Sequence, residues 1–165
     1  MKKYELTAEF IEKWGKKLFR IKALIGFGSV EAGELGGYVE KEDNLAQNGN
    51  AWVFDDAEVY GNARVYGNAR VCGNAEVYGN ADYLLIGRIG SRFSFTTFFK
   101  NKDKGITVSC GCFLGTIAEF RAKVTDTHGN NKHAKMYNLA ADMAELQILG
   151  EEHFDKLNTN KSEPF

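Results

Sequence analysis

The chain has 165 residues, with 21 Lys and Arg against 22 Asp and Glu, which gives a formal net charge of −1. This length suits one compact domain, and the near-neutral charge excludes nucleic-acid binding driven by a global basic field. A hydrophobic content of 44% and an aromatic content of 13% supply a real core and exclude a largely disordered chain.

Membrane and secretory classes are also disfavoured. No apolar run reaches the roughly 18 residues that a membrane span needs, and residues 1–20 lack a signal-peptide pattern. The three cysteines therefore point to a reducing compartment rather than to a disulfide scaffold. We expect a cytoplasmic protein with no membrane partner.

The N-terminal segment predicts a helix over residues 7–18. Thr7 is a candidate N-cap, and an apolar stripe recurs at helical spacing at Phe10, Ile11, Trp14 and Leu18. Residues 19–24 then alternate as a short strand. The glycines of 26–37 lack the helix start and the Lys-Ser/Thr of a phosphate loop, so we interpret them as chain corners.

A repeat of six residues is the strongest pattern in the chain. From residue 50 to residue 85 it reads NAWVFD, DAEVYG, NARVYG, NARVCG, NAEVYG and NADYLL, and a degenerate unit, NLAQNG, precedes it at 44–49. Within each unit Ala and Val lie two residues apart, so they share one face of an extended segment. The Gly-Asn pair can take a positive φ and turn the chain.

A strand and a corner every six residues predict a triangular parallel β-solenoid, with three units, or 18 residues, in each coil. This register places Trp52 under Arg70, Tyr60 under Tyr78, and Glu58 under Glu76 as an unfavourable like-charge pair. An ordinary β-meander with hairpin stacking is the alternative.

The run A-x-V-Y-G-N resembles the hexapeptide repeat of left-handed parallel β-helix proteins. The chain is similar, over about residues 18–149, to the polymer-forming or putative-transferase-like members of that group that are common in bacterial phages and prophages. The resemblance implies the left-handed sense and a homo-oligomer, a trimer or a dimer. It implies a fold more than an activity.

The segment after the repeat predicts an α+β unit. Residues 93–99 and 106–110 read as two strands around the turn NKDKG. Thr116 and Glu119 form a capping box for a helix that Gly129 can end, and a second helix follows over residues 131–149. The polar residues at the C-terminal end suggest a frayed tail.

The predicted fold is therefore mainly β: a short left-handed parallel β-helix with a leader and a C-terminal cap. The predicted divisions are a helix and strand leader at 1–43, the hexapeptide solenoid at 44–87, the α+β unit of a hairpin and two helices at 88–149, and the tail at 150–165.

Aromatic side chains outside the Ala and Val positions form the first candidate site. We expect five of them to point outward, where they would serve a subunit interface or a ligand: Trp52, Phe54, Tyr60, Tyr66 and Tyr78. The alternative is that they pack under the cap, or reflect strand propensity alone.

The second candidate site is the pattern C-x-C-x15-H-x4-H, formed by Cys110, Cys112, His128 and His133. Two thiolates and two imidazoles can bind zinc, but the cysteines are closer together than in the usual zinc motif. Small, partly buried cysteines with two helix-end histidines are the favoured interpretation of the pattern, so no metal or cofactor is predicted. A separate interpretation makes Cys112 a nucleophile whose thiolate His128 stabilises.

We expect a non-enzymatic, phage-type interaction protein that binds a host macromolecule or a small signal. An inhibitor of bacterial immunity, such as an anti-CRISPR protein, is the role that the resemblance suggests. The alternative is an acyltransferase-like or thiol-dependent enzyme that uses Cys112 and His128. Hexapeptide acyltransferases place a catalytic His on a coil, and this repeat holds none. Direct nucleic-acid binding is not expected, because acidic residues interleave with the arginines of the repeat.

Overall fold

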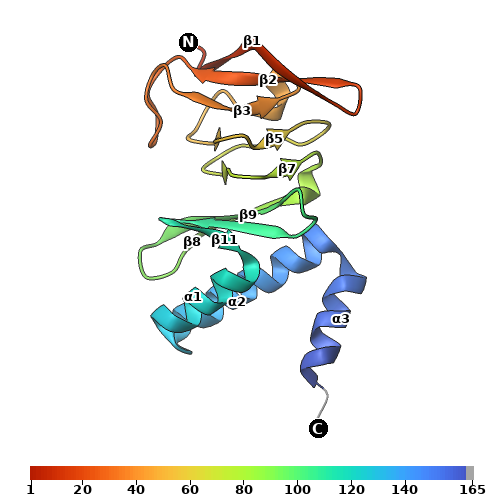
Figure 1. Cartoon of the computed structure of the whole chain (residues 1–165). Coiled ribbons are helices and arrows are strands. Elements are labelled where there is room, and N and C mark those ends of the chain that lie inside the picture. The colour runs from red at the N-terminus through yellow and green to blue at the C-terminus, as the bar shows by residue number, and fades with distance from the viewer. Residues whose placement is uncertain (163–165) are drawn as a thin grey trace.

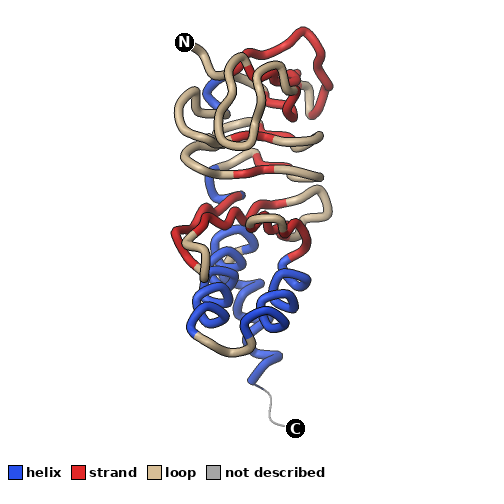
Figure 2. Tube along the Cα trace, turned by 90° about the vertical axis from the view of Figure 1, so that its left-hand side faces the viewer, coloured by secondary structure: helices blue, strands red, loops and turns tan. Residues whose placement is uncertain are grey.

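The structure is a computed structural model, and it describes residues 1–162 of the chain. The molecule is elongated, with the N-terminus and the C-terminal helix at opposite ends (Figure 1). Short strands stack along the first half, a broader antiparallel sheet crosses the middle, and the helices lie beyond that sheet (Figure 2).

The strands are β1 (Tyr4–Lys13), β2 (Lys16–Ala23), β3 (Leu35–Val39), β4 (Trp52–Val53), β5 (Glu58–Val59), β6 (Arg70–Val71), β7 (Glu76–Val77), β8 (Tyr83–Ile89), β9 (Ser94–Lys100), β10 (Ile106–Cys110) and β11 (Phe113–Thr116). The helices are α1 (Ile117–His128), α2 (Lys132–Ala144) and α3 (Glu151–Ser162), with a π-helical turn at Glu145–Leu149 between α2 and α3. Short 3-10 turns lie at Glu42–Asn44 and Asn80–Asp82.

The strands form three separate sheets. One is five-stranded and mixed, in the order β1-β2-β3-β5-β7; one is four-stranded and antiparallel, in the order β11-β10-β9-β8; and β4 pairs with β6 alone. The predicted fold class, a left-handed parallel β-helix, is therefore wrong. The described chain is a small mixed α/β protein without a closed or solenoid sheet.

The repeat itself explains why no solenoid sheet closes. Its strands are only two residues long, and around Val65 the pairing falls to a single parallel bridge with Leu45. Antiparallel strands take over at both ends, with β1 and β2 extending the sheet of β5 and β7. A solenoid needs several coils that support one another, and this repeat supplies too few.

Two features predicted from the repeat are confirmed. Trp52 pairs with Arg70 and Glu58 with Glu76, both in parallel and 18 residues apart. The repeated small side chains point inward and are buried: Ala51, Ala57, Ala63, Ala69 and Ala75, with Val53, Val59, Val65, Val71 and Val77. The pleat of an extended segment and its corner residues therefore decide the local structure, even though the sheet is not continuous.

The N-terminal prediction of a helix is wrong, because residues 7–18 belong to the antiparallel hairpin of β1 and β2. The apolar spacing that suggests a helical stripe instead makes cross-strand pairs, Phe10 with Phe19 and Ile11 with Leu18. The two phenylalanine rings lie 5.9 Å apart. Cross-strand packing satisfies such a pattern as well as a helix face does.

The four-stranded antiparallel sheet separates two hydrophobic cores. Adjacent residues of β9 point to opposite faces, so Phe99 packs with the repeat while Phe98 packs with the helices. On the helix side, the rings of Phe98 and Phe120 meet edge to face at 5.6 Å. The sheet thus fixes the helices relative to the stacked strands.

The helix ends follow the predicted caps. The Thr116 hydroxyl accepts a hydrogen bond from the Glu119 amide at 3.2 Å, and Gly129 ends α1 with a φ of 64°. The predicted frayed tail is wrong for residues 151–162, which form α3. Residues 163–165 lie outside the described part of the chain. Among residues 1–162, no helix has the length and apolar character needed to cross a bilayer.

Candidate ligand-binding groove

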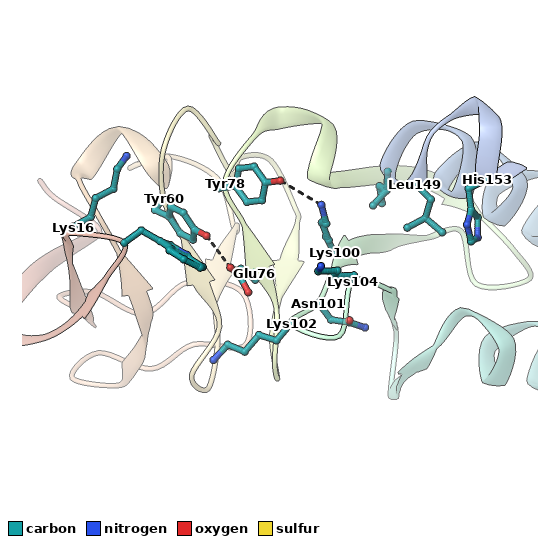
Figure 3. A pocket seen from close by; sticks show the side chains of 12 residues that line it. Lys16, Tyr60, Glu76, Tyr78, Lys100, Asn101, Lys102, Lys104, Leu149 and His153 are labelled. Carbon is teal, nitrogen blue, oxygen red and sulfur yellow. Dashed lines mark hydrogen bonds between the residues drawn. The ribbon is translucent and has the colours of Figure 1, made fainter.

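A groove of about 760 Å³ runs along one side of the molecule, from the β1–β2 hairpin to α3 (Figure 3). Six separate segments line it: the β1–β2 turn, the ends of β5 and β7, the β9–β10 turn, the π-helical turn and α3. Its volume falls in the range of small-molecule sites. The groove is therefore a product of the tertiary fold.

The floor of the groove is a pair of stacked tyrosines. Tyr60 and Tyr78 occupy the same position of the repeat, 18 residues apart, and their rings lie 5.7 Å apart at an interplanar angle of 28°. The Tyr60 hydroxyl donates a hydrogen bond to the Glu76 carboxylate at 2.8 Å. Burial, reinforced by Glu76, raises the pKa of Tyr60 above its ordinary value, so this hydroxyl stays protonated.

Trp14 forms the rim at the hairpin end. It lies in the two-residue turn between the paired residues Lys13 and Lys16, and its side chain is 78% exposed. Its φ is 53° and that of Gly15 is 74°, so both residues adopt the left-handed conformation of a type I′ turn. A bulky side chain is rare at such a position, where Asn is preferred.

Four lysines line the groove: Lys16, Lys100, Lys102 and Lys104. Lys100 lies over the Tyr78 ring, 5.2 Å from its centroid, and donates to the Tyr78 hydroxyl at 3.4 Å. Lys16 and Lys102 each pair with a glutamate, Glu40 and Glu58. The Lys100 ammonium group also lies 3.9 Å from a carboxylate oxygen of Asp82, so three of the four lysines have an acidic partner.

Lys104 is the least neutralised of these cations. Across residues 1–162 no ion pair or side-chain hydrogen bond involves it, and its φ of 62° places it in the left-handed region of the tight β9–β10 turn. Asn101 holds that turn by accepting from the amides of Asp103 and Gly105 at 3.0 Å and 3.1 Å. The turn therefore presents an ammonium group at the groove without a counter-ion.

The far end of the groove is apolar. Ile148 and Leu149 come from the π-helical turn, and His153 from the first turn of α3. Figure 3 shows Leu149 and His153 beyond the lysines, on the side opposite Lys16 and Tyr60. The groove thus has an aromatic end, a middle lined by lysines, and a far end lined by two aliphatic side chains and an imidazole.

The structure distributes the five predicted aromatic residues among different environments. Tyr60 and Tyr78 lie in the groove, and Tyr78 is 47% exposed. Trp52 is fully buried against Phe27 and Tyr4, so the expectation that it points outward is wrong. In a two-residue strand beside the N-terminal hairpin, its ring fills the space under that hairpin.

The remaining two aromatics lie away from the groove. Phe54 is half-buried under the Arg70 guanidinium, 4.5 Å from its ring centroid. Tyr66 is 57% exposed and meets Tyr83 edge to face. Tyr66 lines a second, smaller groove of about 640 Å³ with Phe95, where Arg64 supplies positive charge.

The cysteine and histidine pattern is only partly brought together. The rings of His128 and His133 lie 5.5 Å apart, and His128 stacks on Tyr137. Cys110 accepts a hydrogen bond from the Thr96 hydroxyl at 3.2 Å. Burial and the neighbouring Cys110 raise the pKa of Tyr137 to about 12.

Cys112 stands apart from this cluster, exposed in the turn between β10 and β11. Within the described residues 1–162, no three His, Cys, Asp or Glu side chains are placed to hold a metal ion. The contacts of His128 are with His133 and Tyr137, and neither connects it to Cys112.

Sequence reasoning missed Trp14 and the lysines as site residues. Trp14 falls within the predicted helical stripe, and the lysine-rich run at 100–104 predicts only a turn. Three lysines within five residues were a detectable signal. Their convergence with Trp14 was not, because it depends on how the hairpin and the antiparallel sheet sit on the repeat.

No protein-family model matches the chain, and no curated protein sequence is significantly similar to it. The expected membership of the hexapeptide-repeat β-helix proteins is therefore wrong, on this finding and on the sheet arrangement above.

Proposed function

We propose that the chain is a non-enzymatic binding protein that takes an anionic organic small molecule into the groove of Trp14, Tyr60, Tyr78 and the four lysines. The observation that carries this proposal is the Lys104 ammonium group, which has no ion pair within residues 1–162 and lies in the same groove as the stacked rings of Tyr60 and Tyr78. An apolar concave site with a few convergent polar groups is the usual form of a small-molecule site.

The groove supports binding of a small signal rather than of a host macromolecule. Its volume of about 760 Å³ is that of a small-molecule site. Inhibition of bacterial immunity remains a prediction, as do a homo-oligomer and a cytoplasmic location. The enzyme alternative has less support, because within residues 1–162 no hydrogen bond or ring contact joins Cys112 to His128, whose ring packs with His133 and Tyr137.

The direct test uses anilinonaphthalene sulfonate, an anionic aromatic dye, as the probe. We expect saturable binding that weakens with salt, because the lysines supply part of the affinity. Replacing Lys100 or Lys104 with Gln should weaken binding by about threefold each, the loss of one partly exposed charge contact.

The matched control is Lys123→Gln, which removes an exposed lysine of α1 outside the groove. It should bind the dye as the unmodified protein does. Equal affinity of all four proteins would overturn the proposal, since the dye would then be held without the groove lysines.

A further inference from the structure

We infer that the ligand is a nucleotide with two or more phosphate charges, whose base stacks on Trp14 while its phosphates meet the lysines of the β9–β10 turn. This inference rests on the proposed function and names its ligand class. Three independent features of the groove carry it.

The first feature is the conformation of Trp14. The turn would be most stable with Asn before Gly15, yet it holds an indole at a φ of 53°, 78% exposed. Phe93 shares the positive φ and the exposed ring, but only Trp14 of the two lines the groove, so the strained turn places an indole where a ligand would lie. An exposed indole offers a stacking surface to any base.

The second feature is the number of cations at one place. Lys100, Lys102 and Lys104 come from a single turn and face the groove together. Lys102 pairs with Glu58 and Lys100 lies 3.9 Å from Asp82, whereas Lys104 has no ion pair within residues 1–162. A phosphate chain offers several oxygens, so it can bind the Lys104 ammonium group and share the other two with their carboxylates. Lysine binds phosphate as a mobile point charge, which suits a flexible chain.

The third feature is the order of the groups along the groove. In Figure 3, Lys16 and Tyr60 lie toward the hairpin end, and Tyr78 lies between them and the Lys100 ammonium group. The Tyr78 ring touches Lys100 directly, 5.2 Å from its centroid. A molecule that is aromatic at one end and polyanionic at the other matches this order.

The same chemistry occurs in a free nucleotide and in single-stranded nucleic acid. The structure favours the free nucleotide, because Leu149 and His153 line the groove beyond the lysines and no lysine or arginine of residues 1–162 lines that end to bind a continuing phosphate backbone.

The test exploits the two tryptophans of the chain. Trp52 is fully buried and Trp14 is exposed, so quenching of the emission by adenosine diphosphate reports stacking on Trp14. Affinity is measured separately by calorimetry with adenosine diphosphate and with tripolyphosphate. Trp14→Asn removes the ring but suits the turn, and it should lower the nucleotide affinity by about tenfold while leaving that for tripolyphosphate unchanged.

Trp14→Phe keeps a ring and should retain most of the nucleotide affinity without the quenching. The matched control is Phe93→Asn, because Phe93 is also exposed, at 70%, with a positive φ of 49°, but lies in the β8–β9 turn. It should bind as the unmodified protein does.

Equal nucleotide affinity for the unmodified protein and Trp14→Asn would overturn the inference. Tighter binding of a short single-stranded oligoadenylate than of adenosine diphosphate would overturn the free nucleotide as the occupant. If the anionic dye binds and the nucleotide neither binds nor displaces it, the nucleotide assignment fails while the proposed anion site stands. If neither binds, both fail.

Discussion

Glu58 and Glu76 occupy paired positions of the parallel strands β5 and β7, and both carboxylates reach the same ammonium group. The Nζ atom of Lys13 lies 2.6 Å from Oε2 of Glu58 and 3.1 Å from Oε1 of Glu76, and Lys102 supplies a second cation to Glu58 at 3.0 Å. The unfavourable charge pair that the repeat predicts is therefore neutralised by side chains from outside the repeat.

Lys13→Met should destabilise the fold. It leaves two neighbouring carboxylates, one of them buried, with less compensating charge, and we expect a loss of about 2 kcal/mol because Lys102 still pairs with Glu58. Urea denaturation measures this, with Lys22→Met, an exposed lysine of β2, as control. A loss no larger than that of the control would contradict the bridging role.

The same cluster predicts a loss of stability in acid. Burial acts to raise the pKa of Glu76, but hydrogen bonds from Tyr60 and Lys13 outweigh it and hold the pKa below its ordinary value of 4.5. Below pH 4.5 the unfolded chain binds a proton at Glu76 more readily than the folded protein does, so the free energy of unfolding decreases as the pH is lowered. Glu76→Gln should flatten this dependence in denaturation measured across acidic pH; an unchanged slope would refute the assignment.

Lys3 predicts a second pH dependence of the same sign, at alkaline pH. It is buried, donates to the Ala51 carbonyl at 2.8 Å, and lies over the Phe27 ring. Burial lowers its pKa from 10.5 to about 8, so the unfolded chain binds more protons between these values and stability rises with pH there. Between these pH values the free energy of unfolding should rise by up to about 3 kcal/mol more than that of Lys3→Met, which lacks the titrating group. Parallel curves for the two proteins would contradict this.

The contact between the N-terminal hairpin sheet and the repeat should tolerate no added volume at Gly36. A Cβ atom there would lie 2.6 Å from the Val53 carbonyl oxygen and 2.7 Å from the Trp52 ring. Gly36→Ala should therefore cost about 3 kcal/mol in urea denaturation. Gly26→Ala is the matched control, since its nearest atom would be the Val30 oxygen at 3.6 Å; equal losses would show that the packing is not tight.

The repeat and the caps could be predicted from the sequence because short-range physics decides them. The burial of Val59 and Val77 can be predicted because the pleat of an extended strand places them on the same face as the alanines. The Thr116 cap can be predicted because its hydrogen bond joins residues only three apart. The sheet order could not be predicted, because a six-residue period does not determine how many residues of each strand pair with the next coil, or which strands from outside the repeat join the sheet. The helical stripe at Phe10 and Leu18 was ambiguous, since a hairpin satisfies the same spacing.

The candidate site was recoverable only in part. Tyr60 and Tyr78 follow from the 18-residue register, but Trp14 and Lys104 join them through contacts among distant segments. Trp52 is the opposite case, because the repeat predicts it as an outward-facing site residue and the structure buries it. Its burial depends on the N-terminal hairpin, which the helix-like spacing of residues 7–18 does not predict.

The most direct test of the binding groove is an amide NMR titration of the full chain with anilinonaphthalene sulfonate. We expect shifts concentrated at the residues that line the lysine-containing groove, which are 14, 16, 60, 76, 78, 100–102, 104, 148, 149 and 153. The second groove, around Tyr66 and Phe95, serves as an internal control because it has aromatic rings with less positive charge. Shifts centred there, or none at all, would contradict the account.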